Sequence, residues 1–174
     1  MSFGFSTKRF TDSVNTHITD DAVKDELITL CGEYESKKTP VQKAAHIKSL
    51  MDILDKKVIA KTRKVLMADC HCLGATVLQK AVTMKKESKN LDEFLEKFDH
   101  TMKREGNVIH VMYSKCYCPS VNKTKKKFSD TYCQCSCGFN KKLFETALNK
   151  KVEVTLRNSI LQGADQCDIE IRIL

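Results

Sequence analysis

The hydrophobic positions in the first two thirds of the chain recur every three or four residues, which is the period of an amphipathic helix. A helix is expected from Asp20, with an apolar face of Val23, Leu27, Leu30, Cys31 and Tyr34. A second helix should begin at Thr39, because Pro40 suits the first helical position and Gln42 completes a capping box. Its expected apolar face consists of Val41, Ala44, Ala45, Leu50, Met51 and Leu54.

Two further helices follow from the same period. One apolar stripe runs from Ile59 to Ala81 and predicts a single helix with Gly74 inside it, where close approach by another backbone would explain the glycine. The next helix should begin at Asn90, with Glu93 as its capping partner, and end at Gly106. Residues 1–20 have no clear period, which predicts an irregular N-terminal arm.

After Gly106 the period changes to two, which is typical of strands. Residues 108–118 should form a strand with Ile109, Val111 and Tyr113 on one face and His110 on the other. Residues 131–137 alternate again, a short helix is expected around 140–149, and strands begin at Val152 and Cys167. The fold class is therefore α+β, with N-terminal helices packed on a C-terminal antiparallel sheet of ββαββ order. A single domain is expected over 1–174, with the arm at 1–20, the helical part at 21–105 and the ββαββ part at 107–174.

Composition places the chain among folded proteins of the cytoplasm. It has 41% apolar and 30% charged residues, and a formal charge of +8. No run of about 18 apolar residues could span a membrane, and the first residues lack the apolar stretch of a signal peptide. Thiols stay reduced in the cytoplasm, so nine cysteines indicate metal binding, redox chemistry or burial rather than disulfides.

Five cysteines occur in two short segments, 116–119 and 133–137. In extended backbone, residues two apart project from one face, so paired strands would bring these five thiols together. Thiolates bind zinc, and a structural zinc site needs four ligands, although this spacing is not that of a zinc ribbon. The predicted metal ligands, with zinc as the expected ion, are Cys116, Cys118, Cys133, Cys135 and Cys137. Packing of the same thiols into a core is the competing interpretation.

Four other residues are candidates for ligand binding. Cys70 and His71 belong to a Cys-His-Cys run, in which Cys70 should point inward and His71 or Cys72 should meet water. His110 is a second candidate base for a catalytic thiol. Tyr113 is the fourth candidate. Cys31 and Cys167 continue apolar faces and are expected to be buried and chemically quiet.

The lysine-rich run 123–127 lies between the two cysteine segments. Nearby ammonium groups would favour thiolates over thiols, and they would attract an anionic ligand. A nucleic-acid partner is not expected, because tryptophan is absent and no recognition module is present.

The closing run, from Val152-Glu-Val154 through Ser159-Ile160-Leu161 to Cys167-Asp-Ile169, resembles the end of the 4-vinyl-reductase-like domain. That domain is similar to ligand-binding modules of TRAPP trafficking subunits and prokaryotic sensors, and thiazoline-carboxylate hydrolase is a relative. The patterns 115–119, 131–136 and 143–145 also resemble an uncharacterised prokaryotic family. The resemblance covers roughly 60–174 and implies a ligand pocket between helices and sheet, but no defined reaction.

Two functions follow. The first is a cytoplasmic, cysteine-rich protein that binds a metal or a small molecule. The alternative is a hydrolase of a small carboxylate substrate, which would use a thiolate nucleophile or metal-bound water. Either function is compatible with a homodimer.

Overall fold

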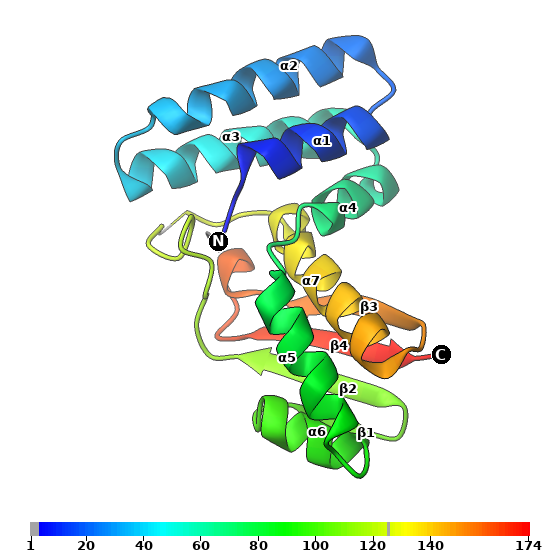
Figure 1. Ribbon diagram of the computed structural model, residues 1–174. Coiled ribbons are helices and arrows are strands. Elements are labelled where there is room, and N and C mark those ends of the chain that lie inside the picture. Colours follow the sequence, from blue (N-terminus) through cyan, green and yellow to red (C-terminus); the bar gives the residue numbers. More distant parts are fainter. Residues whose placement is uncertain (1–3, 125) are drawn as a thin grey trace.

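The computed structural model describes residues 4–124 and 126–174, and these form one α+β domain (Figure 1). The α-helices are α1 Thr7–His17, α2 Asp21–Gly32, α3 Pro40–Lys57, α4 Ala60–Asp69, α5 Ala75–Lys86, α6 Leu91–Phe98 and α7 Asp130–Leu148. The strands are β1 Lys103–Glu105, β2 Val108–Tyr113, β3 Val152–Asn158 and β4 Cys167–Ile173, and two short 3-10 helices are η1 Glu33–Ser36 and η2 Ile160–Gln162. No helix in the described part of the chain has the length and apolarity needed to cross a bilayer.

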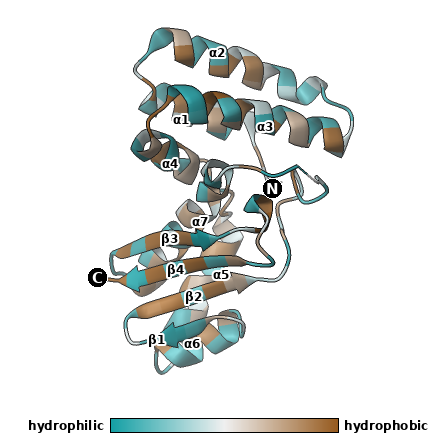
Figure 2. Cartoon of the chain, turned by 180° about the vertical axis from the view of Figure 1, so that it is seen from behind, coloured by the Kyte–Doolittle hydropathy of each residue, from teal (hydrophilic) through white to brown (hydrophobic). Residues whose placement is uncertain are grey.

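The sheet has the order β1-β2-β4-β3, and all three strand pairs are antiparallel. β1 and β2 form a hairpin, and Gly106 in its turn has φ +61°, a left-handed conformation that favours glycine. Ile109 and Val111 of β2 pair with Ile171 and Ile169 of β4, and all four side chains are buried. Helices α5 and α7 cover this face of the sheet, whereas Figure 2 shows the opposite face without a helix over it. The alternation predicted for residues 108–113 is therefore confirmed.

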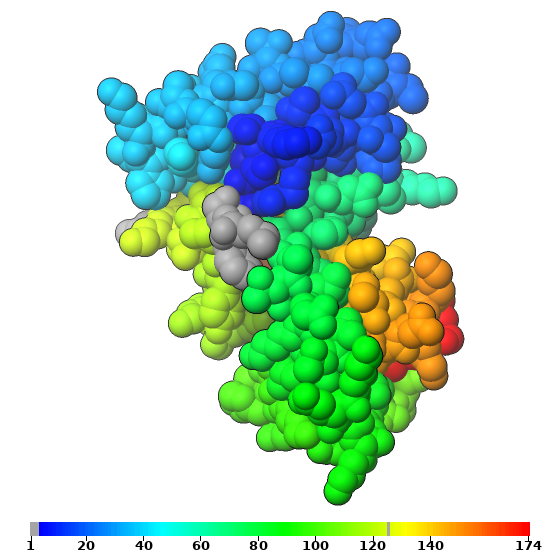
Figure 3. All heavy atoms as spheres, in the orientation of Figure 1, coloured from blue at the N-terminus to red at the C-terminus, as the bar shows by residue number. Residues whose placement is uncertain are grey.

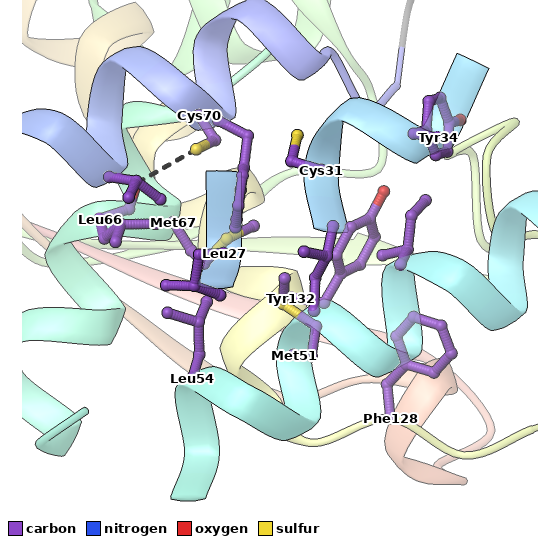
Figure 4. Packing of buried hydrophobic residues seen from close by; sticks show 14 of the residues in the cluster. Leu27, Cys31, Tyr34, Met51, Leu54, Leu66, Met67, Cys70, Phe128 and Tyr132 are labelled. Atoms are coloured by element: carbon purple, nitrogen blue, oxygen red, sulfur yellow. Dashed lines mark hydrogen bonds between the residues drawn. The ribbon is translucent and has the colours of Figure 1, made fainter. Parts of the chain in front are cut away.

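Helices α1, α2 and α3 form a separate layer above α4 and the first half of α7 (Figures 1 and 3). The capping box of Thr39 and Gln42 is present, as the sequence predicts. Leu50, Met51 and Leu54 of α3 are buried. Figure 4 shows Met51 and Leu54 with Leu66, Met67 and Tyr132 in one core cluster. Val41, predicted in the apolar face, is instead 64% exposed in the first turn of α3.

Helix α7 joins the two cores. Its first half packs with α3 and α4, and its second half packs on α5 and β3. Gly138 lies at the crossing with α4, where a Cβ atom would be 1.9 Å from the carbonyl oxygen of Ala68. Only glycine permits this approach of the two backbones. The close backbone contact expected for Gly74 is therefore found at Gly138, and Gly74 is the N-cap residue of α5.

Three predicted elements differ from the structure. The irregular arm is wrong over Thr7–His17, which form α1 with Ser6 as its cap; residues 1–3 lie outside the described chain. The single helix from Ile59 to Ala81 is two helices, because the chain leaves helical geometry between Asp69 and Ala75. The fourth helix ends at Phe98 rather than at Gly106.

The predicted strand at 131–137 is also wrong, since these residues begin α7. Both sides of this part of α7 are covered, and Thr131, Tyr132, Cys133, Gln134 and Cys137 are all buried. A helix buried on most sides has no apolar stripe, so its sequence lacks the period of 3.6. The ββαββ order nevertheless holds, with the β1–β2 hairpin as its first pair.

Candidate functional site: a thiol-lined pocket

A pocket of about 200 Å³ lies between the first half of α7, the end of α4 and one end of the sheet. Met67 of α4, Leu161 of η2 and Ile169 of β4 contribute apolar walls. Gly4 and Phe5 border the pocket on the N-terminal side, and the Phe5 amide donates a hydrogen bond of 3.0 Å to Ser120 Oγ. The pocket is thus formed by segments far apart in the sequence.

Seven of the nine cysteines line this pocket. They are Cys70, Cys72, Cys116, Cys118, Cys133, Cys135 and Cys167. Although cysteine favours buried positions, a random choice of 21 lining residues from this 174-residue chain would include only about one cysteine. All nine cysteines are free thiols. The concentration of sulfur is therefore a property of the pocket and not of the core in general.

Helix α7 presents two of these thiols in different directions. Positions two apart on a helix differ by about 200° in direction, so Cys133 and Cys135 face different sides of α7. The Cys133 thiol is under the electrostatic influence of Cys167, Cys116 and Cys118.

The electrostatic neighbours of the Cys135 thiol overlap in part with those of Cys133. It is under the influence of Cys118, Cys133, Cys72 and Cys70. Cys118 thus acts on the thiols of both Cys133 and Cys135.

The segment after β2 carries Cys116 and Cys118. It has no regular secondary structure, and the carbonyl of Cys118 accepts the backbone N–H groups of Val121 and Asn122 in a turn. The Cys118 Sγ lies 3.1 Å from the hydroxyl oxygen of buried Tyr132, within hydrogen-bonding distance. The predicted strand 108–118 therefore ends at Tyr113. The two cysteine segments still meet, through a loop and a helix rather than through paired strands.

At the far end of the pocket, the α4–α5 connection supplies Cys70 and Cys72. Cys70 caps the end of α4, is buried as predicted, and its thiol donates to the carbonyl of Leu66 at 3.3 Å (Figure 4). Cys72 is half-buried in the following loop. Because Cys72 has left the helix, both thiols can border one pocket, which a regular helix would prevent.

Burial controls the protonation of the pocket thiols. Desolvation raises the pKa of Cys70 and of Cys133 to about 12, and it raises the pKa of Cys135 well above its ordinary value. It also raises the pKa values of Cys116 and Cys167. These five cysteines are therefore neutral thiols at neutral pH. The prediction that nearby lysines favour thiolates is wrong in direction for these residues; Lys125 of that run lies outside the described chain.

Asn140 and Tyr113 are two of the polar side chains in the lining. Asn140 of α7 is 1% exposed; its Nδ2 donates to the carbonyl of Ser136, but its Oδ1 has no hydrogen-bond partner. Tyr113 also borders the pocket, and burial raises its pKa to about 12, so its hydroxyl is protonated and can donate. The lining therefore holds an amide and a phenol beside each other, since the Asn140 side chain acts on the Tyr113 hydroxyl.

The structure brings only part of the predicted site together. Tyr113, Cys70 and four of the five predicted metal ligands line the pocket, whereas Cys137 does not. Cys137 is buried on α7, and the Leu156 backbone acts on its thiol. Cys137 does not line the pocket, so its role as a metal ligand stays a prediction.

The two histidine candidates lie outside the pocket lining. His71 is half-buried, its Nδ1 accepts the N–H of Leu73 at 3.4 Å, and burial lowers its pKa. His110 is on the face of β2 opposite to Ile109 and Val111, with its Nδ1 3.7 Å from Asp168 Oδ1. The described lining contains neither a histidine nor a carboxylate.

Sequence reasoning missed two of the pocket thiols. The core position predicted for Cys31 is confirmed, but the same prediction is wrong for Cys167, which is half-buried at the pocket. The Cys167 Sγ accepts the N–H of Ile160 at 3.4 Å, which fixes it beside η2. A continuous helix predicts that His71 or Cys72 meets water, whereas the helix ends at Asp69 and Cys72 borders the pocket. The spacing of Cys70 and Cys72, the same as in the other two segments, was the available signal.

The pocket thiols are spread along the lining rather than gathered at one point. Across residues 4–124 and 126–174, no three His, Cys, Asp or Glu side chains are close enough together to hold one metal ion as they stand. The thiols instead line a common space, so an ion would have to draw them inward. Cys72 and Cys118 lie in loops outside regular elements.

Comparison with known proteins gives a family but no activity. No curated protein matches the chain, and no solved structure matches it. The resemblance to the 4-vinyl-reductase-like domain therefore gains no support, while membership of an uncharacterised family is confirmed. Residues 8–174 match one family across nearly the whole chain, and the protein belongs to this family of unknown function, DUF6144.

Proposed function

We propose that the protein binds a soft metal through the cysteine sulfurs of the thiol-lined pocket. The observation that supports this function is the convergence of seven of nine cysteines, from four separate segments, on one pocket. Packing alone gives no reason for sulfur at these positions, since valine or isoleucine would fill the space without a risk of oxidation. Thiolates are the preferred ligands of zinc, copper(I) and iron–sulfur clusters.

The raised pKa values of the thiols agree with this function. A neutral thiol in an apolar wall costs little, whereas an uncompensated thiolate there would be expensive. When a metal binds, each ligating thiol loses its proton to solvent, and the cation compensates the new charge. Binding should therefore release protons and weaken as the pH falls.

Catalysis has less support than binding. The hydrolase alternative needs a base or a metal-bound water beside the reacting group. The described lining offers no histidine or carboxylate as a base, and Lys115 at the rim is its one charged side chain. We therefore propose a binding protein, and leave cytoplasmic location and dimerisation as expectations.

A small organic ligand is the second candidate. Asn140 favours it, because the buried Oδ1 without a partner could accept a hydrogen bond from a ligand N–H or O–H group. Tyr113 could donate to a carboxylate or carbonyl of the same molecule. An Asn140→Leu variant should lose such a ligand and keep the metal, because the amide is not a soft-metal ligand.

The test compares two cysteines of the same helix. Cys133 and Cys137 are one turn apart on α7 and both are buried, but only Cys133 lines the pocket. Reduced protein would be prepared without oxygen and titrated with Cd²⁺ or Zn²⁺ against a chromophoric chelator. Cys133→Ser should weaken binding by at least about tenfold, the lower bound seen even when an outer-shell partner is removed. Cys137→Ser should bind like the wild type. Equal affinities in the two variants would contradict the proposal.

A further inference from the structure

Cys118 differs from the other pocket thiols in the group that faces its sulfur. Its Sγ lies 3.1 Å from the hydroxyl oxygen of Tyr132, which is 3% exposed. Within the described part of the chain, this sulfur is the only hydrogen-bond partner of the hydroxyl. Burial raises the pKa of Tyr132 well above its ordinary value, so the hydroxyl keeps its proton and can donate to the sulfur. Such a donor stabilises negative charge on sulfur, which is the nucleophilic form.

Cys118 can also be reached from the pocket. It lies in the loop after β2, is half-buried, and borders the pocket. Burial instead keeps five of the other pocket cysteines as neutral thiols, which are poor nucleophiles. Cys118 therefore combines the two properties of a reactive cysteine, which are access and a stabilised charge.

A second, independent observation indicates an organic ligand in the same pocket. The Asn140 side chain lines the pocket and is 1% exposed, and its Oδ1 has no hydrogen-bond partner among the described residues. A buried acceptor of this kind calls for a donor from a ligand. Tyr113 borders the pocket near Asn140, and its protonated hydroxyl can donate to a ligand carbonyl. A molecule with one hydroxyl and one carbonyl group suits both side chains.

The remaining walls limit what else the ligand can be. Met67, Leu161 and Ile169 are apolar, so the rest of the molecule should be a hydrocarbon. The pocket volume of about 200 Å³ is below the roughly 300–1,000 Å³ of sites for drug-sized ligands, which favours a small molecule. The described lining has no histidine or carboxylate to protonate a leaving group. Addition to a double bond is the reaction that needs no leaving group.

We infer that Cys118 forms a covalent adduct with a small hydroxyalkenal, an α,β-unsaturated aldehyde that carries a hydroxyl group and an apolar tail. The sulfur electron pair forms a bond to the β-carbon, and the carbon–carbon π bond breaks. The π electrons then bind a proton at the α-carbon, so that S–H adds across the double bond without an oxidant. This inference develops the organic-ligand candidate and does not depend on metal binding, because it uses one sulfur.

The test uses 4-hydroxy-2-nonenal, with 2-nonenal as the matched probe that lacks the hydroxyl group. Each aldehyde would be added to reduced, metal-free, full-length protein, and mass spectrometry would assign the adducts over time. Cys118 should be modified at least about tenfold faster than Cys72 and Cys116, which are also half-buried. Its rate should saturate with aldehyde concentration, because binding in the pocket precedes the new bond.

Two substitutions separate the roles of the neighbouring side chains. Tyr132→Phe keeps the ring and removes the donor, so it should move the pH–rate profile of Cys118 upward by about one unit, a tenfold loss of rate at pH 7. Tyr34→Phe is the control, because Tyr34 is buried in the same core cluster but lies outside the pocket lining. Circular dichroism would confirm that both variants are folded.

Asn140→Leu tests the contact with the ligand hydroxyl. Rates with the two aldehydes would each be divided by the rate with free N-acetylcysteine, which removes their intrinsic difference in reactivity. Wild-type protein should then prefer 4-hydroxy-2-nonenal, and Asn140→Leu should lose this preference. Equal corrected rates in the wild type would overturn the hydroxyalkenal assignment whether or not the variant folds.

The other outcomes are equally distinct. Modification of Cys118 no faster than that of Cys72, or a rate that never saturates, would overturn the covalent site. An unchanged pH–rate profile in Tyr132→Phe would overturn the role of the phenol. The Cd²⁺ titration is made without aldehyde, so failure of the adduct leaves the proposed metal binding to its own test.

Discussion

The crossing of α4 and α7 at Gly138 fixes the distance between two walls of the pocket. Met67 and Cys70 belong to the α4 side, and Cys133 and Cys135 belong to α7. A Gly138→Ala substitution adds one methyl group at the closest point of the two backbones. Its Cβ would lie 1.9 Å from the carbonyl oxygen of Ala68, 2.5 Å from the carbonyl carbon and 2.8 Å from the Cα.

The expected loss of stability can be worked out from these distances. Ordinary van der Waals contact begins near 3.4 Å, so the two helices would have to separate by about 1.5 Å. The obstacle is backbone, which cannot turn aside, and therefore the upper part of the usual overpacking cost, about 3 kcal/mol, is expected. Alanine regains about 1 kcal/mol through its higher helix propensity. The net loss is about 2 kcal/mol, which lowers the melting temperature of a chain of this size by roughly 4–8 °C.

Thermal unfolding of the metal-free protein, followed by circular dichroism, measures this loss. Gly32→Ala is the control, because Gly32 is also helical and a Cβ there would meet nothing within 4 Å. It should melt at or slightly above the wild-type temperature. The Gly138→Ala variant should also bind Cd²⁺ more weakly, since the α4 and α7 thiols move apart. A Gly138→Ala protein as stable as the wild type would refute the close crossing.

Three other predictions concern single contacts. Desolvation raises the pKa values of Cys70 and Cys133 to about 12, against an ordinary 9.0. As the pH rises from 9 to 12, these thiols ionise in the unfolded chain but not in the folded protein. The free energy of unfolding is therefore unaffected by them below pH 9 and falls between pH 9 and 12. Urea unfolding at pH 8 and pH 10 should differ by about 1 kcal/mol for each such thiol, and equal midpoints would contradict these pKa values. Thr39→Ala removes the capping box of α3 and should cost about 1 kcal/mol in urea unfolding; no change would mean that the cap is not formed in solution. Tyr132→Phe deletes the hydroxyl beside Cys118 and should cost about 1 kcal/mol, and a more stable variant would show that this contact is unfavourable.

Elements with local signals could be predicted from the sequence. The capping residues of α2, α3 and α6 are where the sequence places them, because side-chain capping depends on residues within one turn. The alternation in β2, β3 and β4 reflects a sheet with one buried face, which imposes a period of two. The α+β class and the ββαββ order follow from these signals.

Elements that are buried by residues distant in the sequence were predicted less well. Helix α7 is enclosed by α3, α4, α5 and β3, so burial removes its periodic pattern, and alternating cysteines look like a strand. The break between α4 and α5 has no proline, and the apolar stripe continues through it from Leu66 to Val77. Ser6, Phe10 and Val14 did carry the signal of α1, with a cap and an interval of four.

In the pocket, too, the sequence predicted some of the lining residues and missed those that depend on contacts distant in the sequence. That Cys116, Cys118, Cys133 and Cys135 meet was predicted correctly, but from a pair of strands that does not exist. The contributions of Cys72 and Cys167 depend on the α4–α5 loop and on η2, neither of which has a periodic signature. The rise in thiol pKa depends on burial, which a lysine-rich neighbouring sequence does not reveal.

Alkylation of each cysteine, resolved by mass spectrometry, with and without Cd²⁺ tests most directly whether the pocket thiols act as one ligand set. The half-buried Cys72, Cys116 and Cys118 should react in the metal-free protein. They should become protected together, over the same range of Cd²⁺ concentration, because they line one pocket. Cys31 and Cys137 are buried outside the pocket lining and should react slowly whether or not Cd²⁺ is present. If Cys72, Cys116 and Cys118 remain as reactive with Cd²⁺ as without it, the thiol-lined pocket is not a metal-binding site.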